Sequence, residues 1–285
     1  MSKLKIAIQK NGRLSEKSLE LLSNCGIKLS NGDRTLKATS ENFPIEILFL
    51  RDDDIPQYVE QGVADIGILG ENEVVEKNKD VIVVGKLGFA KCRLSLAIPK
   101  EDNFQDIGYF QNKKIATSYP FILKKYLSEN NLTAEIEEIG GSVEIAPSIG
   151  LADAIFDIIS TGSTLLTNGL KEVKTIMNSE AVIIANKHIP NVQNQILEKL
   201  LFRINAVRNA QENKYILLNA PNDNIENIKQ LIPGMKSPTI IPLSTEGWSS
   251  MHSVVKEDIF WDVIDQLKHY GAQGILVVPI EKMIL

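Results

Sequence analysis

The sequence contains only two cysteines and three histidines in 285 residues. Cys25 and Cys92 stand alone, which excludes a disulfide framework and a Cys/His zinc site. The sequence also lacks a block of lysine and arginine with interleaved aromatic residues, and its formal net charge is -5. These features argue against nucleic acid as the main partner.

Long apolar runs are absent as well. The N-terminus, Met1-Ser-Lys-Leu-Lys-Ile-Ala-Ile8, lacks an apolar run long enough for a signal peptide, and no later stretch approaches a membrane span. We therefore expect a cytoplasmic protein without membrane contact. The hydrophobic content of 44% and the charged content of 24% are typical of a globular chain. Its length favours about two domains of ordinary size.

The most informative stretch lies just past the middle of the chain. Residues 154–159 predict a short buried strand, which runs directly into Ser160-Thr161-Gly162-Ser163-Thr164. Such a turn can hold an anion, because free amides, hydroxyls and a permissive glycine surround it. Asp153 and Asp157 would repel a bare phosphate, so they suit a ligand that also carries hydroxyls or magnesium, such as a ribose phosphate. The alternative is an ordinary turn with Ser163 or Thr164 as the helix cap.

The first predicted strand, residues 4–9, ends in a glycine-containing loop with two cations. A helix should follow, with Ser15 as its N-cap and Gly26 as its stop. Loops at this place in open α/β sheets commonly meet the ligand. Lys10 and Arg13 are therefore candidate polyphosphate contacts, and solvated loop cations are the alternative.

A second predicted strand, residues 45–50, ends at Arg51 and three aspartates, followed by Pro56. Three adjacent acids suggest a metal site. An aspartate just before a proline is, however, typical of a capped helix N-terminus, and we favour that interpretation. Arg51 is the stronger candidate for a ligand contact.

A short repeat indicates two similar lobes. Gly62-Val-Ala-Asp65 matches Gly150-Leu-Ala-Asp153, and each is followed by an apolar strand and a polar turn. A ligand would then lie in the cleft between two α/β lobes. In the second lobe, Thr117 and Ser118 precede a helix opened by Pro120 and offer a further anion site. A strand at 181–185 and a helix at 193–209 should return to the first lobe.

The chain from Lys214 onward predicts a separate module. Its strands and helices should alternate in βαββαβ order, the ferredoxin-like arrangement. The expected elements are strands at 215–218, 239–243, 251–255 and 274–279, with helices at 224–231 and 258–269. Modules of this kind often bind small regulators between copies, which is an analogy by fold. His252 and His269 are expected on surfaces or helix faces.

Several segments together carry a resemblance to a known family. They are residues 144–165, Gln9-Lys-Asn-Gly-Arg-Leu14, Arg51-Asp-Asp-Asp-Ile-Pro56, Gly67-Ile-Leu-Gly-Glu-Asn72, Ala116-Thr-Ser-Tyr-Pro120 and Pro279-Ile-Glu-Lys-Met283. In combination they resemble the long form of ATP phosphoribosyltransferase, the first enzyme of histidine biosynthesis. The resemblance covers essentially the whole chain.

The resemblance implies an α/β fold with two periplasmic-binding-protein-like lobes and a C-terminal ferredoxin-like, ACT-like regulatory domain. Residues 1–92 and 181–210 would form lobe I, and residues 93–180 would form lobe II with the phosphoribosyl-binding loop. Residues 211–285 would bind histidine as a feedback inhibitor. Homo-oligomers, a dimer and a less active hexamer, are also implied.

The implied reaction joins N1 of ATP to C1 of 5-phosphoribosyl 1-pyrophosphate and releases pyrophosphate. Mg²⁺ would arrive on the substrates, without a dedicated protein metal site. An oxocarbenium-like transition state calls for orientation and charge stabilisation, so we name no general base.

The resemblance also implies roles for individual residues. The 5-phosphate would be held by Ser160, Thr161, Gly162, Ser163 and Thr164. Asp153 and Asp157 would lie by the ribose hydroxyls, and Glu144 or Asp157 could stabilise the positive ribose. The residues expected to contact ATP or pyrophosphate are Lys10, Gly12, Arg13, Arg51, Asp65, Glu71, Arg93 and Tyr119. Contacts to regulatory histidine fall on Asn219, Met235, Ser237, Thr239 and Gly274.

Two other classes share parts of this architecture. A solute-binding or effector-sensing protein has the bilobal fold, but no signal peptide or helix-turn-helix segment is evident here. A prephenate dehydratase pairs such lobes with an ACT domain, but its characteristic Thr-Arg-Phe is missing. Release of pyrophosphate would separate all three classes.

Overall fold

The computed structural model describes residues 2–30 and 36–285. The chain forms two compact units. The first contains Met1–Ser23 and Ile27–Leu197, and the second contains Asn24–Gly26 and Glu198–Leu285. The division falls inside the long helix α6 (Asn191–Glu212). No helix of the described residues is long and apolar enough to cross a membrane.

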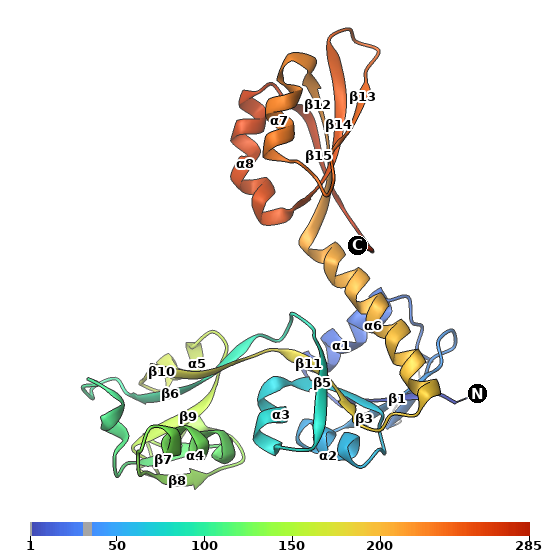
Figure 1. Ribbon diagram of the computed structural model, residues 1–285. Helices are drawn as coiled ribbons and strands as arrows, with labels where there is room; N and C mark the ends of the chain where they lie inside the picture. The colour runs from blue at the N-terminus through green and yellow to red at the C-terminus, as the bar shows by residue number, and fades with distance from the viewer. Residues whose placement is uncertain (1, 31–35) are drawn as a thin grey trace. The chain divides into compact units, whose positions relative to one another are not determined.

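The first sheet of unit 1 has the strand order β2-β3-β1-β4-β11-β5 (Figure 1). Its strands are β1 (Leu4–Gln9), β2 (Lys37–Thr39), β3 (Ile45–Leu50), β4 (Ile66–Gly70), β5 (Val81–Lys86) and β11 (Ala181–Asn186). Strand β1 is parallel to β3 and β4, and it is buried on both sides, as expected of a central parallel strand. The helices of this lobe are α1 (Arg13–Asn24), α2 (Ile55–Glu60) and α3 (Glu71–Lys77).

The second sheet of unit 1 has the order β10-β6-β9-β7-β8. Its strands are β6 (Cys92–Pro99), β7 (Lys114–Thr117), β8 (Glu135–Glu138), β9 (Ala154–Ile159) and β10 (Leu170–Ser179). Helices α4 (Pro120–Glu129) and α5 (Ser163–Thr167) accompany it. Phe110 and Phe156 are the largest fully buried side chains in its core. Strand β9 is therefore central, and its C-terminal end carries the loop predicted from the sequence.

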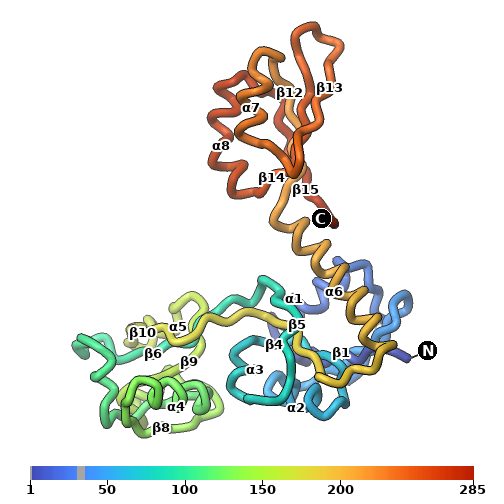
Figure 2. The backbone as a smooth tube through the Cα atoms, viewed as in Figure 1, coloured from blue at the N-terminus to red at the C-terminus, as the bar shows by residue number. Residues whose placement is uncertain are grey.

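Two connections link the two sheets of unit 1. The chain leaves the first sheet between β5 and β6 and returns between β10 and β11, and Figure 2 shows both crossings as a tube. They run together, because Ser179 of β10 pairs with Cys92 of β6. Residues 181–186 thus rejoin the first sheet beside β4. The lobe boundaries proposed above stay predictions.

Two helix caps predicted from the sequence were wrong, and a third lacks a side-chain bond. Helix α1 begins at Arg13, so Ser15 lies inside its first turn, and the Gly12 carbonyl accepts the Glu16 amide at 3.1 Å. Asp54 occupies the N-cap position of α2, with Pro56 in the first turn, as predicted. Its side chain makes no capping bond, and residues 52–54 form a 3₁₀ turn that leads into the helix. Gly162, rather than a hydroxyl residue, occupies the N-cap of α5.

Unit 2 contains the predicted βαββαβ module. Its sheet has the order β13-β14-β12-β15, as in ferredoxin-like folds. The elements are β12 (Asn213–Pro221), α7 (Ile225–Leu231), β13 (Thr239–Pro242), β14 (Trp248–Lys256), α8 (Glu257–His269) and β15 (Gln273–Pro279). Residues alternate between buried and partly exposed along β12 and β14, because one face of the sheet packs with α7 and α8.

Candidate active site

The loop after β9 is shaped by one glycine. Gly162 has a φ of 82°, a left-handed conformation that L residues other than glycine rarely adopt. The Thr161 and Ser163 hydroxyl oxygens lie 3.0 Å apart across it. The loop therefore turns sharply from the buried strand into α5 and keeps its hydroxyls together.

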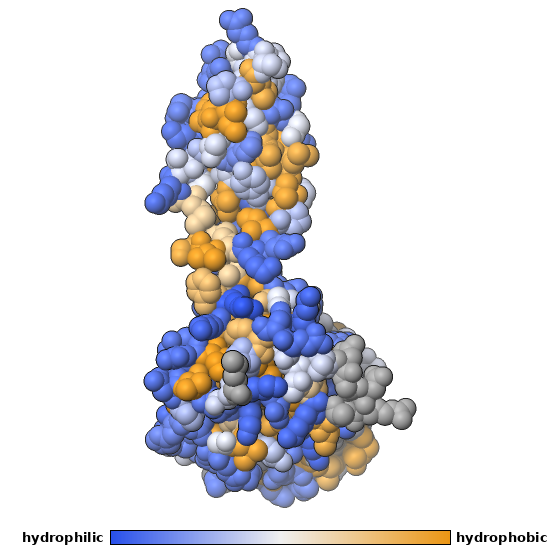
Figure 3. All heavy atoms as spheres, turned by 90° about the vertical axis from the view of Figure 1, so that its right-hand side faces the viewer, coloured by the Kyte–Doolittle hydropathy of each residue, from blue (hydrophilic) through white to orange (hydrophobic). Residues whose placement is uncertain are grey.

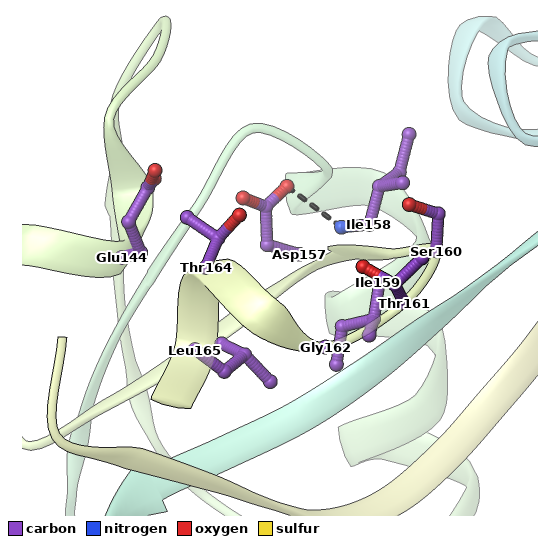
Figure 4. Close-up of a pocket in the computed structure, with 9 residues that line it drawn as sticks. All are labelled: Glu144, Asp157, Ile158, Ile159, Ser160, Thr161, Gly162, Thr164 and Leu165. Carbon is purple, nitrogen blue, oxygen red and sulfur yellow. Dashed lines mark hydrogen bonds between the residues drawn. The ribbon is translucent and has the colours of Figure 1, made fainter. Parts of the chain in front are cut away.

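A cavity of about 150 Å³ lies against this loop (Figure 4). Its lining residues are Glu144, Asp157, Ile158, Ile159, Ser160, Thr161, Gly162, Thr164 and Leu165. Figure 4 shows the side chains of Glu144, Asp157 and Thr164 pointing to the same side of the site. The structure thus brings two predicted carboxylates together with four of the five predicted loop residues. Ser163 is outside the lining but contacts Thr161.

Asp157 is the most perturbed carboxyl group in this cavity. Burial raises its pKa from the usual 3.8 to about 6, and the nearby Glu144 carboxylate adds to the rise. A hydrogen bond from the Ile158 amide at 2.8 Å acts in the opposite direction. A buried carboxylate next to a second one creates a negative potential, which favours a ligand that develops positive charge.

Arg93 holds the start of the loop instead of projecting into a pocket. Its guanidinium donates to both oxygens of Glu172, at 2.7 and 2.5 Å, and to the Ser160 carbonyl at 3.3 Å. The hydroxyls of Ser95 and Thr175 also donate to Glu172. This bonding, Arg93 above all, lowers the pKa of Glu172 to about 2. The geometry supports a structural role for Arg93 beside the loop.

A second pocket, of about 370 Å³, lies between the two lobes of unit 1. Arg51, Asp52, Asp53, Glu73 and Lys77 line it from the first lobe; Ser118, Tyr119, Glu138, Ile139 and Gly140 line it from the second. The structure therefore brings together two predicted contacts, Arg51 and Tyr119. Burial raises the pKa of Tyr119 strongly, and the carboxylates of Glu73 and Asp157 raise it further. Tyr119 thus links this pocket electrostatically to the cavity at the loop.

Other predicted contacts lie elsewhere. Lys10 and Gly12 are exposed on the loop between β1 and α1, and Arg13 is exposed at the start of α1. None of the three lines either pocket. Glu71 accepts a hydrogen bond from Lys86 at 2.9 Å and lines a different pocket, beside Cys92 at the crossing between the sheets. The structure does not bring these residues to the loop.

Asp65 and Asp153 lie at the N-terminal ends of β4 and β9. The Asp153 carboxylate accepts the Lys114 amide at 2.8 Å, and the Asp65 carboxylate accepts the Lys5 amide at 2.7 Å. Six residues of strand separate Asp153 from the Ser160 loop, a distance of about 20 Å at the usual rise of a strand. We therefore leave both aspartates out of the proposed site.

The predicted regulatory residues lie in unit 2. Asn219 and Gly274 are neighbours, because a Cβ built on Gly274 would lie 3.4 Å from Asn219 Nδ2. Thr239 pairs with His252 across β13 and β14. Met235 is 56% exposed in the segment before β13, which also contains Ser237.

Sequence reasoning missed four charged residues of this region: Glu73, Glu76, Lys77 and Glu172. The first three belong to α3, whose seven residues are too few to show a helical period. Within the described ranges, no three His, Cys, Asp or Glu residues are grouped so that they could hold a metal ion.

These observations define a class: a bilobal α/β protein with a hydroxyl-lined loop pocket and a separate ferredoxin-like module. Comparison with known proteins identifies the family. The ATP phosphoribosyltransferase family model matches residues 51–206, and the model of the HisG C-terminal domain matches residues 210–282. The chain belongs to the ATP phosphoribosyltransferase family, and it is accordingly a transferase.

Individual relatives agree with this assignment. ATP phosphoribosyltransferases of Bacteroides thetaiotaomicron and Azobacteroides pseudotrichonymphae are 57% and 58% identical to this chain, and each alignment covers 99% of it and 100% of the relative. One chain of the HisG:HisZ ATP phosphoribosyl transferase complex from Thermotoga maritima is 31% identical, with a TM-score of 0.61. That match covers 71% of this chain and 98% of the other.

A more distant match concerns the fold alone. A putative periplasmic sulfonate-binding protein from Methylobacillus flagellatus is 15% identical, with a TM-score of 0.52 over 81% of this chain and 72% of that one. The expected likeness to periplasmic binding proteins is confirmed at the level of fold. Family membership decides against the solute-binding and dehydratase alternatives.

Proposed function

We propose that this chain joins N1 of ATP to C1 of 5-phosphoribosyl 1-pyrophosphate, releases pyrophosphate and thereby performs the first step of histidine biosynthesis. The observation that carries the proposal is the cavity after β9, where a hydroxyl-rich loop faces Glu144 and Asp157. A phosphoribosyl group needs donors for its phosphate and acceptors for its ribose hydroxyls. This cavity offers both within one small volume.

The loop would bind the 5-phosphate through its hydroxyls and the amides of the tight turn. The two carboxylates would then lie on the ribose side. Displacement at C1 develops positive charge on the ribose ring as the C1–O bond to pyrophosphate weakens. Ionised Asp157, with Glu144 close by, would stabilise that charge. Adenine N1 is already a nucleophile, so the reaction requires no general base.

The pocket between the lobes would receive ATP. Arg51 is largely exposed there and can reach phosphate oxygens, while Lys77 supplies a second cation. The Tyr119 hydroxyl stays protonated at neutral pH and can donate a hydrogen bond toward the reaction centre. Closure of the two lobes around both substrates would orient N1 of ATP toward C1 of the ribose. This orientation supplies much of the acceleration in such displacements.

Mg²⁺ would accompany the substrates. The described residues do not fit a dedicated metal site, since no three potential ligands are grouped together. The bound ion would neutralise charge on the phosphates, and no step above depends on a protein ligand to it.

Feedback inhibition by histidine is proposed for unit 2, at the sheet whose strands β12, β13 and β15 carry Asn219, Thr239 and Gly274. Its sheet also exposes apolar side chains, including Ile241, which is 48% exposed, and Leu276, which is 58% exposed. Figure 3 shows hydrophobic patches on this unit. Exposed apolar patches of this kind suit association between copies, which supports the proposed dimer and hexamer.

The experiment is an assay of pyrophosphate release by the full chain with ATP, phosphoribosyl pyrophosphate and Mg²⁺. Release should require both substrates and fall when histidine is added. Release without ATP would indicate simple hydrolysis and contradict the transfer. Sedimentation with histidine and substrates tests the assembly separately, and an unchanged assembly would contradict the proposed shift to a hexamer.

A further inference from the structure

Helix α4 receives its N-terminal cap from the opposite lobe. It begins at Pro120, and Tyr119 in the N-cap position makes no side-chain capping bond. The first turn contains no acidic residue. Instead, the amides of Phe121 and Ile122 donate to the two carboxylate oxygens of Glu76, at 2.8 and 3.0 Å. Glu76 belongs to α3, in the lobe that contains the first sheet.

This carboxylate completes the hydrogen bonding of the first turn of α4. Pro120 has no amide hydrogen, and the Leu123 amide donates to the Tyr119 carbonyl at 3.1 Å. The remaining two amides, of Phe121 and Ile122, donate to the Glu76 carboxylate. A negative charge at the positive end of a helix dipole strengthens both bonds. The helix thus depends on a residue 45 positions away for its cap.

Other contacts between the lobes lie beside this cap. The Asn72 side-chain amide donates to the Tyr119 hydroxyl at 3.2 Å, and its oxygen accepts the Ser179 hydroxyl at 2.8 Å. Val75, also on α3, packs against the hydrophobic core of the second lobe. The cap therefore joins two surfaces that already meet, and it fixes the direction in which α4 leaves Tyr119.

From this geometry we propose that Glu76 is a positioning residue that sets the spacing of the two lobes and so holds Tyr119 against Asn72 in the pocket between them. The kinetic part of this inference rests on the proposed function, since Tyr119 lines the pocket assigned to ATP. Glu76 itself lines neither pocket, so its effect on the reaction passes through α4 and Tyr119.

A carboxylate that only stabilised α4 would have different consequences. It would change the melting temperature and leave the distance between lobes and the turnover of folded enzyme unaltered. The positioning role instead requires that loss of the cap widens the range of lobe separations.

The test compares Glu76→Gln and Glu76→Ala with Glu129→Ala. Glu129 is a matched control, because it lies at the other end of α4, 62% exposed, and meets only an exposed Lys125 at 4.0 Å among its ion pairs. Three quantities are measured on the full chain: kcat and KM for ATP, amide exchange at Phe121 and Ile122, and the distance between spin labels at Lys17 and Glu101. The labels require a background with Cys25→Ala and Cys92→Ser.

For Glu76→Ala we expect kcat/KM for ATP to fall about tenfold, with faster exchange of both amides and a broader distance distribution. Glu76→Gln keeps one acceptor and should lose less than Glu76→Ala. Glu129→Ala should match the wild type within about twofold. Kinetics and distances like those of Glu129→Ala would overturn the inference, and so would lost activity with an unchanged distance distribution. A wild-type chain without transfer activity would refute the proposed function instead. The amide-exchange and distance measurements would still test whether Glu76 sets the spacing of the lobes.

Discussion

The two lobes of unit 1 begin their central strands in the same way. The carboxylates of Asp65 and Asp153 each accept a hydrogen bond from the backbone amide of a residue in the neighbouring parallel strand, at 2.7 and 2.8 Å. The backbone amides of both aspartates donate to the carbonyls of those same residues, Lys5 and Lys114. Gly62 and Gly150 precede them with φ values of 71° and 74°. The repeated sequence thus encodes one local structure, used twice.

The same strands end differently. Strand β4 ends at Gly70 and passes directly into α3, over the buried side chain of Asn72. Strand β9 ends in the hydroxyl-rich loop around Gly162, beside Asp157. The repeat therefore marks the scaffold, and the candidate chemistry lies where the repeat stops. Four groups of substitutions can break or sharpen this contrast.

The largest effect is expected at Asp157. Asp157→Asn should lower kcat about 100- to 1000-fold, because it removes the charge proposed to stabilise the ribose cation. The wild-type rate should rise with pH through about 6, where this carboxyl group ionises. A pH profile of kcat/KM checks both points, and a flat wild-type profile in this range would contradict them.

The same substitution should stabilise the fold at neutral pH. The pKa of Asp157 is raised by folding, so the stability that this group contributes is full below pH 3.8 and is lost as pH rises through about 6. Asn carries no charge to bury, so Asp157→Asn should be about 1–2 kcal/mol more stable at pH 8 and equal to the wild type near pH 4. Thermal melts at the two pH values measure this difference.

The next largest effect is a loss of stability that should differ between Gly70, at the end of β4, and Gly162, after the end of β9. A Cβ on Gly70 would lie 2.3 Å from Asn72 Oδ1, a buried atom bonded to Ser179. Gly70→Ala should therefore cost about 2–3 kcal/mol of stability. Gly162→Ala meets nothing closer than 3.9 Å, so only its positive φ opposes the change, at about 1 kcal/mol. Urea unfolding measures the free energy of unfolding of both variants. Equal losses of stability would contradict the argument that Gly70 is required for close packing against Asn72.

A smaller effect is expected where Arg93 and Glu172 hold the loop. Glu172→Gln and Arg93→Lys each remove the paired bonds, so kcat/KM for phosphoribosyl pyrophosphate should fall about five- to tenfold. Glu129→Gln, in an exposed ion pair of the same lobe, serves as the control. Steady-state kinetics at pH 7.5 suffice, and wild-type values for Arg93→Lys would show that the loop needs no support from this pair.

The smallest effect should be shared by the two aspartates of the repeat. Asp65→Ala and Asp153→Ala should each cost about 1 kcal/mol of stability, since an amide loses its acceptor at a partly solvated strand end. Turnover should stay within about threefold of the wild type in both. A selective loss of turnover in Asp153→Ala would place this residue back in the active site.

The sequence best predicted those features whose residues are contiguous in the chain. The strand at 154–159 and the loop after it follow directly from an apolar run and from residues suited to a tight turn. The βαββαβ order of unit 2 was also predicted, because short apolar strands are separated there by helices that end just before Pro233 and Gly271. These features depend on neighbours in the chain.

The remaining features depend on contacts between distant residues. Strand β10 was missed because register shifts at Glu172/Lys174 and Thr175/Met177 break its alternation. Arg93 was expected to meet a phosphate, but its partner lies 79 residues away. No local pattern indicates that Glu76 caps a helix of the other lobe. The repeat at Asp65 and Asp153 was recognised, but Asp153 was expected beside the ribose, whereas its carboxylate accepts the Lys114 amide at the opposite end of β9 from the loop.

The central claim is that the C-terminal end of β9, and not its N-terminal end, holds the phosphoribosyl group. The most direct measurement is calorimetric titration of phosphoribosyl pyrophosphate with Mg²⁺ into the wild type, Thr161→Ala and Asp153→Ala. The account predicts binding about tenfold weaker in Thr161→Ala, since a hydroxyl donor to the phosphate is lost, and wild-type affinity in Asp153→Ala. Unchanged affinity in Thr161→Ala together with weaker binding in Asp153→Ala would contradict it.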